Sequence, residues 1–251
     1  MLTAADADPV LFHRARADGT DGGRILLTCE HGGRAIPSAL ADLGIPAAEM
    51  DRHIAWDIGA MALSLALMHR VSGRLVAQHY SRLVIDCNRG PVSPDLVPDV
   101  SDGTHIPANK GISQAGIDAR MAAIHAPFHA RIAAEIRHQR PALLVSIHSF
   151  TPVMAGVSRP MHAGFLANRM PAVSDRFMAS FARHAPELTV AQNAPYAVDD
   201  ISDFTVPVHG EANRLPHVLV EVRNDQLRDE QGIERWADLL ALAIHDVETN
   251  P

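Results

Sequence analysis

The stretch 142–150, Ala-Leu-Leu-Val-Ser-Ile-His-Ser-Phe, constrains the fold more than any other part of the chain. Pro141 precedes it, and its first residues are apolar or small, which predicts a short parallel strand covered on both faces. The strand reaches His148 and is followed by the loop composition of residues 149–152. Because ligands bind beyond the carboxyl ends of strands in open α/β sheets, His148 is placed for catalysis or for metal binding.

Apolar strands and amphipathic helices alternate along the rest of the chain. The expected strands are 24–29, 75–80, 83–87, 161–166, 188–192 and 218–222, and the expected helices are 51–70, 113–140, 172–184 and 233–247. This alternation predicts an α/β fold, a three-layer α/β/α sandwich with a mixed, mostly parallel sheet. We expect residues 1–23 to form an N-terminal arm and residues 24–251 a single domain. The proline-rich connection 90–112 is long enough to be a binding loop or a lid.

Composition excludes several classes of protein. The net charge of −7 gives no reason to expect a nucleic-acid or anionic-membrane partner. No apolar run reaches membrane-spanning length, and residues 1–8 lack the features of a signal peptide. Cys29 and Cys87 do not make a disulfide framework, which fits a reducing compartment. We therefore expect a cytoplasmic protein, and whether it forms a homo-oligomer stays open.

Polar residues stand at the ends of four predicted strands. They are His31, the pair Asn88-Arg89, His148 and Glu221. Glu221 is the most informative, because a glutamate inside Leu-Val-Glu-Val is costly to bury unless it is paired or bound. The alternative for Glu221 is a solvent-facing position on an edge strand.

These segments resemble the active-site segments of zinc carboxypeptidases and aspartoacylases. The stretch 146–150 resembles their strand with the last zinc-ligand histidine, and 221–225 resembles the segment of their catalytic glutamate. The stretch 86–89 is similar to the Asn-Arg pair that grips a substrate carboxylate in those enzymes. A closer resemblance is to the N-formylglutamate amidohydrolase family, carried by segments spread over residues 25 to 245. Those segments are 29–33, 53–60, 81–89, 146–150, 205–210 and 219–225.

One departure from the carboxypeptidase pattern concerns the metal ligands. Those enzymes have a glutamate three residues after the first histidine, where this chain has Arg34, which cannot bind a cation. The resemblance therefore implies a Zn²⁺ site, one ion per chain, formed by His31, His148 and Asp57. Glu30 is the alternative carboxylate, although neighbours on an extended chain point to opposite sides. Two histidines and one carboxylate with an open position suit catalytic zinc.

The resemblance also implies a reaction, hydrolysis of the N-acyl amide of an acidic amino acid such as N-formylglutamate. The zinc ion would lower the pKa of its water toward ~7, and Glu221 would act as general base. Arg89, oriented by Asn88, would pair with a substrate carboxylate. Further candidates stay unranked: Arg82 or Arg159 for the oxyanion, and Arg223 and His209 for binding substrate.

Other functions remain open at this point. The same metal site could serve an aspartoacylase-like, succinylglutamate-desuccinylase-like or peptide-cleaving enzyme. A cysteine hydrolase would use Cys87 with His79 or His148, but a cysteine inside an apolar strand favours a buried structural thiol. A non-catalytic metal or small-molecule binding module is a further alternative, since fold alone does not imply activity.

Overall fold

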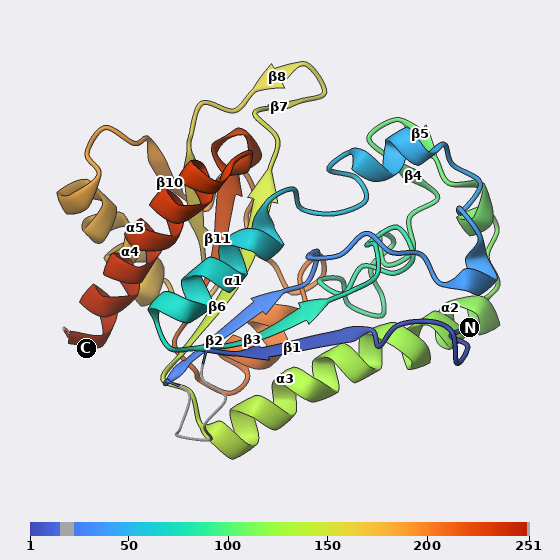
Figure 1. Ribbon diagram of the computed structural model, residues 1–251, viewed down its shortest axis with the longest axis horizontal. Helices are drawn as coiled ribbons and strands as arrows, with labels where there is room; N and C mark the ends of the chain where they lie inside the picture. The colour runs from blue at the N-terminus through green and yellow to red at the C-terminus, as the bar shows by residue number, and fades with distance from the viewer. Residues whose placement is uncertain (16–22, 250–251) are drawn as a thin grey trace.

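The computed structural model of the chain describes residues 1–15 and 23–249. In this part of the chain seven strands form one mixed sheet in the order β1-β3-β2-β6-β11-β9-β10 (Figure 1). The strands are β1 (Val10–Arg14), β2 (Ile25–Cys29), β3 (Arg74–Gln78), β6 (Leu143–Phe150), β9 (Ala163–Leu166), β10 (Val190–Gln192) and β11 (His217–Arg223). The central run β3-β2-β6-β11 is parallel, as is β9-β10, whereas β1 pairs with β3 and β9 with β11 in antiparallel fashion.

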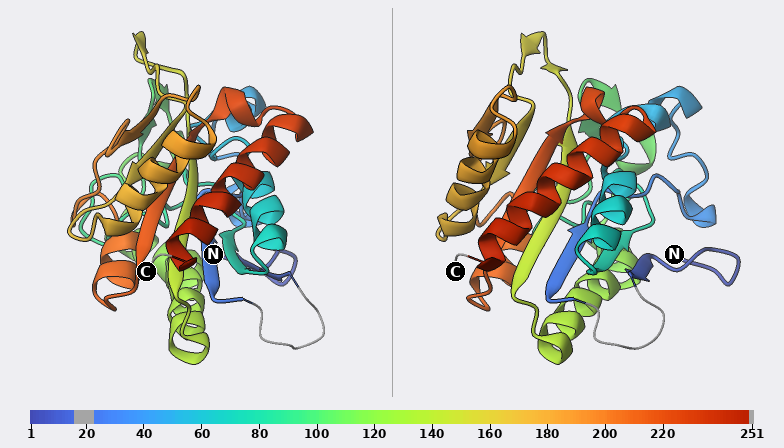
Figure 2. Two further views of the ribbon diagram at one scale, coloured as in Figure 1. Left: turned by 90° about the vertical axis from the view of Figure 1, so that its left-hand side faces the viewer. Right: turned by 60° about the vertical axis from the view of Figure 1, so that its left-hand side comes forward.

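Helices cover both faces of this sheet. On one face lie α1 (Ala60–Arg70), α4 (Ala172–His184) and α5 (Glu230–Thr249), which Figure 2 shows side by side. On the other face lies α3 (Ala126–Gln139), preceded by α2 (Gln114–Arg120) and the π-helical turn η4 (Met121–His125). All eight residues of β6 are buried, as expected for a central strand covered twice. The predicted three-layer α/β/α sandwich with a mostly parallel sheet is confirmed.

Shorter elements complete the described chain, which contains no helix with both the length and the apolarity of a bilayer span. Two small hairpins join β4 (Val100–Ser101) to β5 (Thr104–His105) and β7 (Val153–Met154) to β8 (Val157–Ser158). The remaining turns are η1 (Ser38–Leu40), η2 (Ala47–Asp51), η3 (Pro107–Asn109), η5 (Val206–Glu211) and η6 (Asn224–Leu227). In the stretch expected to be an arm, residues 10–14 form the edge strand β1.

The expected strand 83–87 is wrong. Its backbone forms hydrogen bonds within a local turn and with a loop, and not with a neighbouring strand. Val84 N–H donates to Ser81 O at 2.9 Å, and Asp86 N–H donates to Leu96 O at 2.8 Å. The apolar residues of this stretch are nevertheless buried, because they pack in the core beneath α3. The apolar run that suggested a strand therefore reflects burial in the core and not pairing in the sheet.

The expected helix 51–70 is also wrong in its first half, because helix α1 begins only at Ala60. Gly59 precedes it with φ +83°, a left-handed conformation that favours glycine. A Cβ atom at Gly59 would lie 2.4 Å from Leu227 Cβ, so the turn also needs the missing side chain. Asp57 therefore lies in an irregular turn instead of on a helix face.

Candidate active site

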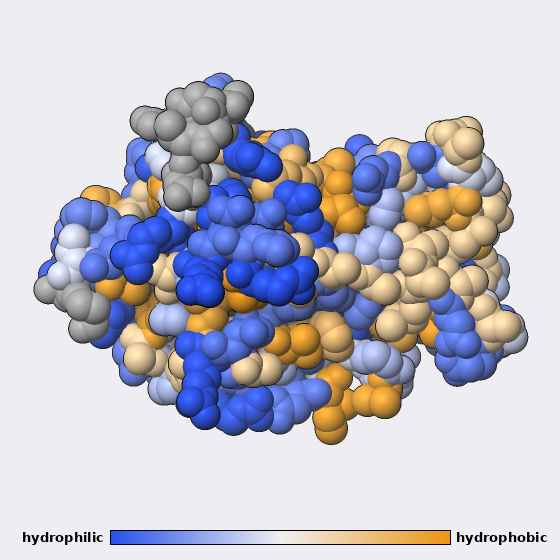
Figure 3. Space-filling view, turned by 90° about the horizontal axis from the view of Figure 1, so that it is seen from below, coloured by the Kyte–Doolittle hydropathy of each residue, from blue (hydrophilic) through white to orange (hydrophobic). Residues whose placement is uncertain are grey.

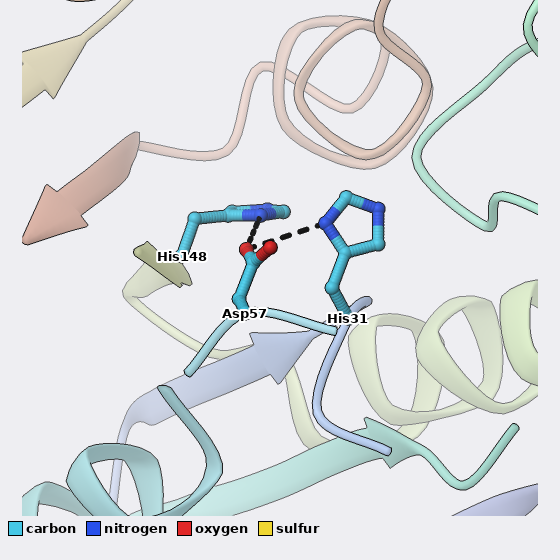
Figure 4. Close-up of side chains that lie close together, drawn as sticks. All are labelled: His31, Asp57 and His148. Atoms are coloured by element: carbon cyan, nitrogen blue, oxygen red, sulfur yellow. Dashed lines mark hydrogen bonds and ion pairs between the residues drawn. The ribbon is translucent and has the colours of Figure 1, made fainter. Parts of the chain in front are cut away.

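His31, Asp57 and His148 meet at the carboxyl end of the sheet. His31 follows β2, His148 lies in the adjacent parallel strand β6, and Asp57 comes from the turn before α1. Asp57 Oδ2 lies 3.3 Å from His31 Nδ1 and 2.9 Å from His148 Nδ1, and Figure 4 shows the carboxylate between the two rings. The Asp57 N–H also donates to the His31 carbonyl at 3.0 Å, which ties the two segments together.

The outer nitrogen of each imidazole is held by a second carboxylate. His31 Nε2 lies 2.7 Å from Asp86 Oδ1, and His148 Nε2 lies 3.0 Å from Glu30 Oε2. Because a carboxylate only accepts, each ring in its Nε2–H tautomer donates to this second carboxylate. Each Nδ1 can then offer a lone pair to a cation on the Asp57 side, the arrangement typical of metal-binding histidines. Glu30 thus orients His148 and does not join the ligand group.

The three candidate ligand atoms all lie within 4.8 Å of one another, and their residues are buried. Burial alone would raise the pKa of Asp57, but the charges and hydrogen bonds of His31 and His148 outweigh burial and lower it. Burial would lower the pKa of His148, yet Asp57 and Glu30 raise it well above the usual value. The donor set of two imidazoles and one carboxylate fits Zn²⁺ with open positions for water and substrate.

Glu221 faces the same site from β11, the strand next to β6. It lies opposite His148 in the parallel register, and β11 is an internal strand, so the edge-strand alternative is wrong. Burial raises the pKa of Glu221 to about 8. Its Oε2 atom is buried and has no hydrogen-bond partner in the described residues. A carboxyl group that is buried, unpaired and next to a metal-binding group is a good candidate for a general base.

A cavity of about 500 Å³ opens over these residues. Its walls include the candidate ligands, Glu221, the loop 95–102 and the loop 196–203. The proline-rich connection therefore contributes to the cavity wall. Phe150, Leu166 and Leu219 give the cavity an apolar side.

Three of the predicted substrate-binding residues line this cavity. Arg82 binds Asp86 Oδ2 at 2.8 Å through Nη2 and lies 3.4 Å from Asp57 Oδ1 through Nη1. Asn88 donates from Nδ2 to Asp203 Oδ1 at 3.0 Å. Arg89 donates to the Ser202 carbonyl and lies 3.8 Å from Asp203 Oδ1, while its buried Nε has no partner in the described part of the chain.

Three other predicted residues lie outside the cavity wall. Arg159 donates to the Tyr196 hydroxyl at 2.9 Å and lies over the rings of Tyr196 and Phe150, both of which line the cavity. Arg223 is bound by Asp225 and by backbone carbonyls of residues 159–161, so it anchors a loop. His209 is buried and lies 3.0 Å from His129 Nδ1 through its Nε2.

Sequence reasoning assigned no role to several residues of the site. Asp86 orients His31 and Arg82, and Ser146 Oγ donates to Glu30 Oε2 at 2.9 Å. Asp203 joins Asn88 and Arg89 from a segment 115 positions away in sequence from Asn88. Asp86 stands two residues before the Asn88-Arg89 pair, and this position could have identified it as a site residue, whereas no local sequence pattern identifies Asp203.

Arg34 and Cys87 are suited neither to metal binding nor to nucleophilic attack. Arg34 is exposed and forms an ion pair with Asp51, away from the metal-binding group. Cys87 is fully buried, and burial raises the pKa of its thiol, so it is not an activated nucleophile.

Comparison with known proteins places this chain in a family. Its structure superposes on that of the Atu2144 gene product of Agrobacterium tumefaciens with a TM-score of 0.91 and 34% identity, covering 99% of this chain and 98% of that one. It also matches an N-formylglutamate amidohydrolase from Ralstonia eutropha with a TM-score of 0.65 and 18% identity, covering 97% and 98% of the two chains. No curated protein sequence matches. The model of the N-formylglutamate amidohydrolase family matches residues 23–228, and the chain belongs to that family.

Proposed function

We propose that this protein is a zinc-dependent amidohydrolase that removes the N-acyl group, formyl first among candidates, from an acidic amino acid such as glutamate. The observation that carries the proposal is the convergence of His31, Asp57 and His148 on one point with Glu221 facing them. Such a group suits hydrolysis of a linear amide bond, the reaction named for the family.

His31, Asp57 and His148 would hold the ion. When bound, Zn²⁺ would act as a Lewis acid that lowers the pKa of a water molecule and polarises the amide carbonyl. Glu221 takes the proton of the attacking water and passes it to the leaving amine. Arg82 lines the cavity beside Asp57, so it is better placed than Arg159 to stabilise negative charge developing on the carbonyl oxygen.

Substrate recognition is assigned to Arg89. Arg89 lines the cavity, and its Nε has no hydrogen-bond partner in the described residues. Its guanidinium can therefore donate hydrogen bonds to a substrate carboxylate. Asn88 fixes this arrangement, since its side chain donates to Asp203 and its oxygen accepts from the backbone N–H of Thr205 at 3.2 Å.

The test combines metal analysis with a substrate panel. Purified protein should contain about one zinc ion per chain, and chelation should abolish amide hydrolysis, with restoration by Zn²⁺. N-formyl, N-acetyl and N-succinyl derivatives of glutamate and aspartate, and the dipeptides, identify the acyl group. Glu221→Gln should retain the metal and lose turnover. Near-normal turnover by Glu221→Gln would show that the general base is another group.

A further inference from the structure

A second cavity, of about 790 Å³, lies at the end of the sheet opposite the candidate active site. It is bordered by the first residues of β6 and β11, the N-terminus of α4 and the C-terminal ends of α3 and α5. Leu143 at the start of β6 is five residues from His148, so the two sites are roughly 17 Å apart along the strand. Figure 3 views the molecule from this end, and its left half shows strongly hydrophilic residues around small apolar patches.

Positive charge is concentrated around this cavity. Among the described residues its wall contains the arginines Arg24, Arg140, Arg176 and Arg214, and one acidic residue, Glu248. None of the four arginines forms an ion pair within the described part of the chain, and Arg176 only donates to the Val247 carbonyl at 3.5 Å. Many other arginines of the protein are paired; Arg183, on α4 like Arg176, forms an ion pair with Asp246 of α5. Unpaired cations gathered in an acidic protein indicate an anion site.

The start of helix α4 also favours an anion in this cavity. Helix α4 begins at Ala172 on its wall, and Pro171 before it makes no capping hydrogen bond, so the positive end of the helix faces this region. His217 also lines the cavity and is 1% exposed. Its Nδ1 donates to the Leu215 carbonyl at 2.8 Å, and in that tautomer the buried Nε2, which has no partner in the residues described, carries a lone pair and does not contribute to anion binding.

We propose that this cavity binds a small organic polyanion, a molecule with two or more phosphate or carboxylate groups. The anionic oxygens accept hydrogen bonds from the guanidinium groups of Arg24, Arg140, Arg176 and Arg214. Leu143, Val173 and Leu215 form an apolar wall for the carbon part of the ligand. The site is separate from the hydrolytic centre and does not depend on the activity proposed for it.

The proposal is tested by calorimetric titration of the full chain with pyrophosphate and, separately, with citrate in phosphate-free buffer. The protein is first stripped of metal and dialysed free of chelator, so that neither anion binds a metal ion at the active site. We expect saturable binding that weakens with added salt. Arg176→Gln and Arg214→Gln should each weaken it about tenfold, the loss expected for a charge-assisted hydrogen bond.

Arg183→Gln is the matched control, because it removes a guanidinium from the same helix outside the cavity, and its affinity should stay within about twofold of the parent. Arg183 and Arg214 are exposed and Arg176 is half-buried, and thermal melts check that the variants fold. Stronger binding of pyrophosphate than of citrate assigns the site to phosphates, and the reverse order assigns it to carboxylates. Absence of binding by both anions, or equal affinities of Arg176→Gln and Arg183→Gln, would overturn the proposal.

Discussion

Replacing Glu221 by glutamine should change the stability of the metal-free protein in a pH-dependent way. Burial raises the pKa of Glu221 from 4.5 to about 8, so the folded protein holds a proton that the unfolded chain releases. The contribution of this protonated carboxyl to the free energy of unfolding is fully present below pH 4.5 and is lost as the pH rises through about 8. At 1.36 kcal/mol per pKa unit, the loss of folding free energy between pH 4 and pH 9 is about 5 kcal/mol. Glutamine stays neutral and avoids this loss.

The assay is urea denaturation of metal-free parent and Glu221→Gln proteins at pH 5, 7 and 9. The two free energies of unfolding should be similar at pH 5 and diverge at pH 9 by several kcal/mol in favour of the variant. Glu187→Gln removes an exposed carboxyl that pairs with Arg235 and should show no such divergence. A constant difference between parent and Glu221→Gln across this range would refute a buried, unpaired carboxyl at position 221.

Three further predictions concern the metal and the substrate. Glu30→Gln should lower zinc affinity about 10- to 100-fold, measured by competition with a chromophoric chelator, because the His148 ring loses its orienting carboxylate. Zinc affinity should fall as the pH drops from 8 to 6. The pKa of His148 is raised, so a proton must leave this ring before the metal binds. Potentiometry during a zinc titration measures the protons released. Arg89→Ala should raise KM for an N-acyl glutamate about tenfold or more and leave the hydrolysis of a neutral N-acyl amino acid little changed in steady-state kinetics.

The regular part of the fold could be predicted from the sequence because its signals are local. Strands β6 and β11 are mostly apolar and buried, and α4 has an amphipathic period bounded by residues 172 and 184. The stretch 83–87 has the same apolar run but is buried by irregular backbone, and only its distant hydrogen-bond partners reveal that difference. Strand β1 was missed because it is short and only partly buried, and pairs with one neighbour at the edge.

The candidate metal-binding group was partly predictable for the same reason. His31 follows one recognisable strand and His148 lies near the end of another, and these two strands are neighbours in the sheet. Asp57 depended on the family resemblance, because its turn has no periodic pattern. The partners Asp86 and Asp203 depend on side-chain hydrogen bonds between segments distant in sequence, which no local pattern encodes.

The topology separates the reacting groups from the groups assigned to recognition. Adjacent parallel strands lie about 4.8 Å apart, and the ring centroids of His31 and His148 are also 4.8 Å apart. The order β2-β6-β11 therefore places the two histidines and Glu221 in one row at the end of a buried sheet. Arg89 and its partner Asp203 lie in irregular segments, where sequence changes cost the sheet little stability. Substitutions in those loops should change substrate preference without loss of zinc, whereas substitutions in the row should affect the metal or turnover for every substrate.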